Sequence, residues 1–248
     1  MKMLNKCFII FTIFTGPSDV FSQSFIPKWE LGANFGLFVY QGDLTPSRTG
    51  SIRTGRFGFN LFANKLLSNA IAIRANLAIA GLKGNDAAYT HPAYRQDRAL
   101  NFKSPVTEVS VLGVWTPFGH RFEGFGGSPY FFTGLGYSFL HIKRDWSNIN
   151  TAAFSAETGV LQGLQEDIQH ALPRGTLVIP AGAGMRYLIS PSFLIQAEIF
   201  YRFTFTDYLD GFSKAANPSR KDQYYSATLG LIYRLGNKNK LNCPPVKN

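Results

Sequence analysis

A period of two in residues 196–204 constrains the fold of this chain more than any other feature. Apolar side chains alternate there with polar ones, Ala197, Ile199, Tyr201 and Phe203 against Gln196, Glu198, Arg202 and Thr204. Such a period predicts a β-strand. The polar side carries an acid and a base, and the apolar side is wide and aromatic. In a soluble sandwich the polar side would face water, whereas in a membrane barrel the apolar side faces lipid and the polar side fills the lumen.

The composition favours strands and a membrane environment. Of the 248 residues, 45% are hydrophobic and 16% are charged, against about 25% charged in an average soluble domain. The chain has 23 Phe, 11 Tyr and 24 Gly residues, which suits many strands and turns. No apolar run approaches the ~18 residues of a membrane-spanning helix.

The net charge of +10 fits a solvated basic surface or contact with anionic lipid head groups and lipopolysaccharide. Nucleic acid is not an expected partner, because the basic residues are scattered along the chain.

The N-terminal residues 1–22 are predicted to be a secretory signal peptide. Lys2 and Lys6 precede the apolar run 7–14, and Ser22 ends a small-residue cleavage motif. Cys243 is then the single cysteine of the exported chain, so no intramolecular disulfide is expected.

Eight segments with this period follow the signal peptide. They span residues 29–40, 55–64, 71–79, 100–115, 130–142, 176–188, 196–205 and 224–235. Connections after the first, third, fifth and seventh are long, and two of the others are tight, as in outer-membrane barrels. We therefore predict an all-β, eight-stranded antiparallel up-and-down transmembrane β-barrel of OmpA/OmpX-like architecture over residues 23–235. A polar periplasmic tail is predicted at 236–248, with both termini periplasmic. Residues 143–175 are expected to be irregular.

Charged side chains on the polar side of these strands are predicted to point into the lumen. They are Glu30, Arg56, Arg74, Glu108, Arg186, Glu198, Arg202 and Arg234. Side chains fill the interior of an eight-stranded barrel, and buried charges must be paired. A structural ionic network is the expected role; an ion or proton path is the alternative.

We expect neither an enzyme nor a metal or cofactor site. Ser138 and His141 are three residues apart in a predicted strand and therefore lie on opposite faces. The remaining histidines, His91, His120 and His170, lack metal-ligand spacing.

Several segments together carry a family resemblance. They are residues 40–44 (YQGDL), 100–105 (LNFKSP), 179–184 (IPAGAG) and 204–210 (TFTDYLD). In this order they resemble the PorG-like (DUF6089) outer-membrane β-barrel family of Bacteroidota, and the last is the most specific, with Asp207, Tyr208 and Asp210 as its signature loop. The resemblance implies an eight-stranded barrel. It also implies an accessory role in the type IX secretion system, at a periplasmic ring built by a lipoprotein and its partner.

Two functional hypotheses follow. In the first, the protein is a non-catalytic anchor whose periplasmic turn and tail contact secretion proteins. The candidate contact residues are Phe118, Arg121, Phe122, Phe125 and Cys243. In the second, the long loops, above all 143–175, bind an extracellular or lipid ligand.

Overall fold

The computed structural model describes residues 28–119, 127–155, 158–217 and 221–235. The predicted signal peptide, 1–22, and the predicted tail, 236–248, lie outside these ranges. In chain order the elements are β1 (Trp29–Gln41), η1 (Ile52–Thr54), β2 (Arg56–Leu66), β3 (Ile71–Asn85), η2 (Asp86–Ala88), α1 (Tyr94–Arg98), β4 (Asn101–Trp115), β5 (Gly127–Leu140), β6 (Lys143–Asp145), α2 (Thr158–Gln169), β7 (Gly175–Ser190), β8 (Phe193–Thr204) and β9 (Gln223–Leu235).

The long strands form a closed antiparallel barrel. Within the described residues, eight long strands follow one another around the wall in the order β3-β2-β1-β9-β8-β7-β5-β4, and the β3–β4 pairing closes it. β1 and β9 pair along their full length, from Trp29↔Leu235 to Gln41↔Gln223. The predicted eight-stranded antiparallel barrel is confirmed. The short β6 adds to the end of β4 through Asn101↔Asp145, beyond the barrel wall.

The two faces of the wall meet different media. Large apolar side chains point outward on every long strand and are exposed, for example Phe35 at 60%, Leu135 at 70% and Leu229 at 70%. Exposed aromatic residues ring one end of the wall: Trp29, Trp115, Tyr187, Phe193 and Tyr233. An apolar band bordered by an aromatic girdle is the surface of a barrel in a bilayer. An exposed apolar surface of this extent would be unfavourable in water.

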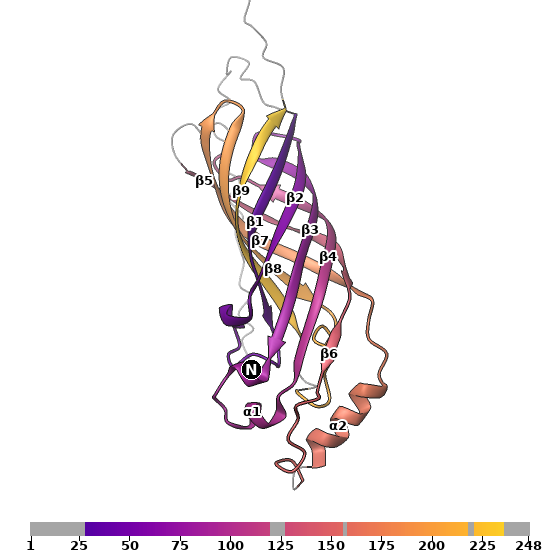
Figure 1. Cartoon of the computed structure of the whole chain (residues 1–248). Coiled ribbons are helices and arrows are strands. Elements are labelled where there is room, and N and C mark those ends of the chain that lie inside the picture. Colours follow the sequence, from indigo (N-terminus) through magenta and orange to yellow (C-terminus); the bar gives the residue numbers. More distant parts are fainter. Residues whose placement is uncertain (1–27, 120–126, 156–157, 218–220, 236–248) are drawn as a thin grey trace, which may run out of the picture.

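The two ends of the barrel differ (Figure 1). At one end lie the tight connections 67–70 and 191–192, together with the start of β1 and the end of β9. At the other end lie η1, η2, α1, β6 and α2, within the long connections. Residues 143–175 were expected to be irregular, and that expectation was wrong in part, because β6 and the twelve-residue α2 form there. No helix within the described ranges is long and apolar enough to cross a bilayer.

The interior changes character along the barrel axis. Towards the end with the long loops, buried apolar side chains from strands and loops form one cluster that includes Phe38, Leu82, Phe102, Leu164, Leu209 and Phe212. Between this cluster and the end with the tight connections, the lumen is filled largely by charged and amide side chains, with smaller apolar clusters among them.

Candidate functional site

Glu198 lies at the centre of the first luminal cluster. Its carboxylate accepts hydrogen bonds from Arg74 Nη1 (2.5 Å), Asn34 Nδ2 (2.5 Å) and the Tyr130 hydroxyl (2.6 Å). The Arg74 guanidinium also lies 4.2 Å from the centre of the Phe62 ring. Since both charged side chains are fully buried, each depends on the other for its charge compensation.

Glu30 continues this cluster towards the end with the short turns. It pairs with Arg186 Nη1 (3.5 Å) and Arg234 Nε (3.3 Å). Asn64 donates to Glu30 (2.9 Å) and accepts from Arg74 Nε (2.9 Å). A single hydrogen-bonded network therefore joins Glu30 to Glu198 and crosses the lumen from Arg74 on β3 to Glu198 on β8.

A second cluster surrounds Glu108, nearer the loops. Arg202 Nε lies 2.7 Å from its carboxylate, and the Tyr224 hydroxyl donates to it at 2.9 Å. Arg202 also donates to the Ser226 hydroxyl (2.9 Å). The paired side chains of the two clusters fill the middle of the barrel.

The structure brings together seven of the eight predicted luminal residues. Arg56 is the exception. It is exposed, although its register partner Phe38 is buried. Arg56 is the first residue of β2, at the rim, where a long side chain can bend away from the apolar cluster and keep its charge in water.

The catalytic alternatives are not assembled in the structure. The Ser138 hydroxyl lies inside the lumen, 2.7 Å from the Tyr224 hydroxyl, whereas His141 is exposed beyond the end of β5. Within the described part of the chain, no group of three or more His, Cys, Asp or Glu side chains could hold a metal ion.

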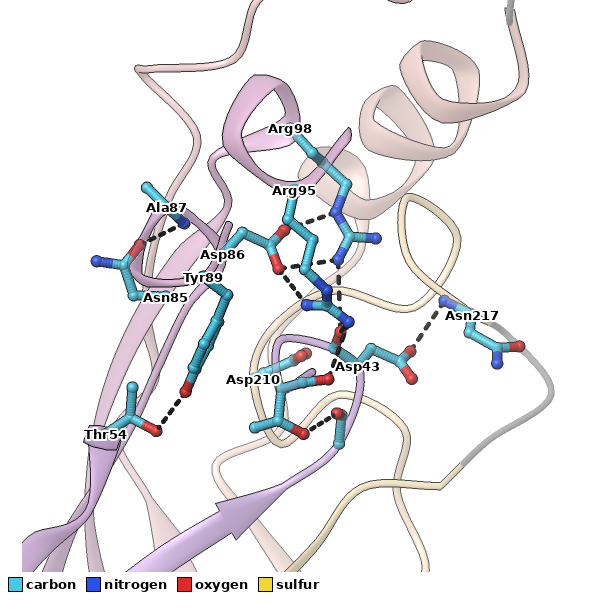
Figure 2. A network of polar contacts seen from close by, with 12 residues as sticks. Asp43, Thr54, Asn85, Asp86, Ala87, Tyr89, Arg95, Arg98, Asp210 and Asn217 are labelled. Carbon is cyan, nitrogen blue, oxygen red and sulfur yellow. Dashed lines mark hydrogen bonds and ion pairs between the residues drawn. The ribbon is translucent and has the colours of Figure 1, made fainter. Parts of the chain in front are cut away.

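A buried arginine clamp closes the barrel end that carries the long loops (Figure 2). The carboxylate of Asp86 accepts from Arg95 Nη1 at 2.6 Å and from Arg98 Nε and Nη2 at 2.6 and 3.1 Å. The two arginines are three residues apart on α1 and so share one face of it. Arg95 Nη2 also donates to the carbonyls of Asp43 (3.0 Å) and Thr45 (2.9 Å). The clamp joins the β3–β4 connection to the β1–β2 connection.

Asp167 on α2 joins the remaining two long connections. Its carboxylate accepts from the backbone N–H groups of Ser213 (3.1 Å), Lys214 (3.1 Å) and Ala215 (2.9 Å). Successive N–H groups that converge on one carboxylate form an anion-binding nest. We call the assembly of 42–55, 86–100, 141–155, 158–174, 205–217 and 221–222 the loop cap.

The predicted signature loop lies inside this cap. The Asp207 carboxylate accepts a hydrogen bond from the Ser213 hydroxyl. The Tyr208 ring stacks on the His170 ring, with the two ring centroids 4.1 Å apart. Asp210 is fully buried and lies 2.7 Å from the Tyr40 hydroxyl, which also lies 2.6 Å from Asp222.

Asp210 of the signature loop and Asp222 at the end of the β8–β9 connection form a buried carboxyl pair around the Tyr40 hydroxyl. The hydroxyl has one hydrogen and can donate it to only one of the two carboxyls at a time. Burial raises the pKa of both carboxyls well above the usual range, and for Asp222 the neighbouring charge of Asp210 raises it further.

The predicted partner-contact residues are described only in part. Phe118 is 57% exposed beside the end of β4. Arg121, Phe122, Phe125 and Cys243 lie outside the described residues.

The loop cap contains functional candidates that the sequence did not reveal: Asp86, Arg95, Arg98, Asp167 and Asp222. Each depends on contacts between connections that are far apart in the chain. The available signal was the i, i+3 pair of arginines, preceded by an aspartate, in a loop between two strands.

Comparison with known proteins places the chain in a family. The family model described as "Domain of unknown function (DUF6089)" matches residues 6–240. The chain belongs to this family. Among curated proteins, none matches the chain.

Several solved structures are similar to this DUF6089 protein. OprG from Pseudomonas aeruginosa is 11% identical, with 85% of this chain and 98% of that chain covered and a TM-score of 0.49. Neisserial surface protein A is 10% identical, with 84% and 97% covered and a TM-score of 0.48. Ail, the attachment invasion locus protein of Yersinia pestis, is 12% identical, with 84% and 99% covered and a TM-score of 0.45.

Proposed function

We propose that this protein is a non-catalytic outer-membrane barrel that serves as an accessory, anchoring component of the type IX protein secretion machinery. In this role it contacts the periplasmic ring, a lipoprotein and its partner, from the membrane. The resemblance of residues 40–44, 100–105, 179–184 and 204–210 to PorG-like proteins suggests the secretion role.

The filled lumen is the observation that best supports a role in anchoring. Arg74, Glu108, Glu198 and Arg202 are buried, paired and in the middle of the barrel, and the loop cap covers one end. Among the described residues these side chains leave no path for a substrate along the barrel axis, so we infer that the protein acts through the surfaces at its two ends. The end with the start of β1 and the end of β9 is the one that we assign to the periplasm, because long loops of outer-membrane barrels face outward.

Co-purification of the ring proteins tests this assignment. The full-length protein with an affinity tag should recover the ring lipoprotein and its partner from membranes solubilised in mild detergent. A variant that lacks residues 118–125 and 237–248 should fold as a barrel but recover much less of them. The matched control shortens the cap at the opposite end, over 146–154, and should recover the full amount. Unchanged recovery with the first deletion would remove the proposed contact surface.

A second candidate function is supported by the construction of the loop cap. Buried ion pairs and backbone hydrogen bonds hold four connections together, and such preorganised loops suit a surface that binds an extracellular or lipid ligand. Deleting 146–154 and losing a surface ligand, with secretion intact, would favour this second function over the first.

A further inference from the structure

Three lysines lie in one row on the outer face of the sheet, at the end with the long loops. Lys83 of β3 stands directly opposite Lys103 of β4, and Lys103 stands opposite Lys143 of β6. The strand neighbours Leu82 and Phe102 are buried, so the lysine side chains point outward. Figure 1 shows β6 beside the end of β4, where the sheet continues past the barrel wall. We call these three residues the lysine row.

The lysine row brings like charges together. Side chains directly opposite each other on neighbouring strands have Cβ atoms ~4.5–5.5 Å apart, and like charges in such pairs destabilise a sheet. Within the described ranges, no ion pair involves any of the three lysines. One carboxylate, Asp145, follows on the same face of β6. Hydrogen bonds from Ser147 lower the pKa of Asp145, and the charge of Lys103 lowers it too. A single carboxylate beside three ammonium groups leaves the row positively charged.

Arg56 adds a further cation to this surface. Its stem lies against Gly81 of β3, because a Cβ atom built on Gly81 would be 3.7 Å from Arg56 Cβ and 3.9 Å from Arg56 Nε. Gly81 shares the outer face of β3 with Lys83, the next outward residue along the strand. The arginine that the alternation predicts inside the lumen therefore borders the lysine row instead.

The depth of the lysine row in the bilayer follows from the length of β4. Lys103 lies at the end of β4 near the long loops, and Trp115 lies in the aromatic girdle at the other end. With ~3.4 Å per residue and a strand tilt of ~35–45°, the two residues are ~30 Å apart along the barrel axis, which is the thickness of the hydrocarbon core. Val109 and Val111 are exposed on the apolar wall between them. The lysine row is therefore level with the lipid head groups of the leaflet opposite to the girdle.

We propose that the lysine row, with Arg56 at its border, binds the phosphate groups of lipopolysaccharide in the outer leaflet. Phosphate oxygens accept charge-assisted hydrogen bonds from lysine and arginine. A lipid with more than one phosphate matches a row of cations on strands ~4.8 Å apart, and its acyl chains would cover the apolar wall between the row and the girdle. The outer leaflet follows from the outward direction of the long loops. The inference goes beyond both candidate functions, because a lipid contact on the outer face is compatible with either.

Native mass spectrometry of the full-length protein in neutral detergent micelles tests the proposal. The probes are lipid A with two phosphates, the same lipid with both phosphates removed, and inorganic phosphate. The diphosphorylated lipid should bind saturably and at least about tenfold more tightly than the dephosphorylated one. Replacing any one lysine of the row by glutamine should weaken its binding about fivefold, and replacing all three should weaken it about a hundredfold.

Lys65→Gln is the matched control for charge. Lys65 is also an exposed lysine on the outer face, but it lies at the opposite end of the barrel, where its Nζ is 5.9 Å from the centre of the Trp29 ring. Its substitution should leave the affinity for lipid A unchanged. Equal binding of the dephosphorylated lipid, or equal weakening by Lys65→Gln and Lys103→Gln, would overturn the site. Binding of inorganic phosphate as tight as that of lipid A would overturn the lipid source and assign the row to the free ion.

Thermal unfolding without lipid A separates binding from folding. Lys103→Gln removes the repulsion from both of its neighbours, so it should leave the melting temperature unchanged or raise it while it weakens binding. A lower melting temperature would contradict the repulsion on which the proposal rests. Recovery of the ring proteins is a separate measurement, so this proposal and the secretion role can fail independently.

Discussion

Replacing Arg74 by methionine should destabilise the barrel by about 3–5 kcal/mol, the usual cost of breaking a buried ion pair. Arg74 Nη1 lies 2.5 Å from Glu198, and both side chains are completely buried. Methionine keeps the apolar contact with Phe62 but leaves the carboxylate with neutral donors only, from Asn34 and Tyr130. A buried charge without its counter-charge is the source of the expected loss.

A double substitution separates the charge from the packing. In Arg74→Met/Glu198→Gln neither member of the pair is charged, and the amide oxygen still accepts from a neighbouring donor. Replacing a buried ion pair by neutral groups of similar volume is often nearly neutral, so the double variant should recover most of the loss. The exposed Arg56 supplies the control, and Arg56→Met should change stability by no more than about 0.5 kcal/mol.

Equilibrium unfolding by urea in phospholipid vesicles measures these differences. Trp29 and Trp115 lie on the outer face near the end of the barrel, so their fluorescence reports transfer from lipid to water. If the slope with urea is unchanged, midpoints convert directly into free energies of unfolding. If Arg74→Met costs no more than Arg56→Met, or if the double variant is as unstable as the single one, the unpaired charge of Glu198 is not the source of the loss.

Three further predictions concern the cap and the barrel wall. Asp86→Asn removes the carboxylate between two buried arginines, so trypsin should cleave within 86–100 at least about tenfold faster, as a loss of ~3–5 kcal/mol would allow; unchanged cleavage would contradict the clamp. The raised pKa of Asp210 means that the contribution of this protonated carboxyl to stability is fully present below about pH 4, the ordinary carboxyl range, and is lost as pH rises through the raised value. Asp210→Asn cannot ionise, and it should flatten the fall in melting temperature with pH; parallel curves for both proteins would argue against the raised pKa of Asp210. Gly36→Ala would bring a Cβ against the backbone carbonyl of Ala227 and should lower the urea midpoint by the equivalent of about 1–3 kcal/mol, whereas an unchanged midpoint would show that the strands separate freely there.

The strands could be predicted from the sequence because each face of the wall meets a different medium. Every second residue faces lipid, so the alternation fixes both the strand and the direction of each side chain. It gave Glu198 and Arg202 their inward positions. The alternation carries no information about the depth of a residue along the barrel axis. For this reason it predicts Arg56 inside the lumen, whereas in the structure Arg56 lies at the rim.

The loop cap could not be predicted in the same way. Its contacts join residues such as Asp43, Asp86 and Asp167 that no period relates, and they form only once the barrel brings the connections together. One element of the cap did leave a local signal. In α2, Val160, Leu161, Leu164 and Ile168 recur at spacings of three and four, which indicates an amphipathic helix.

The electrical conductance of the purified full-length protein in a planar lipid bilayer tests the filled lumen most directly. Paired side chains around Glu198 and Glu108 occupy the middle of the barrel, and the loop cap covers one end. We predict insertion without steady conductance steps, for the wild type and for the cap variant that lacks 146–154. A stable, reproducible open conductance in the wild type would contradict a barrel that acts only through its ends.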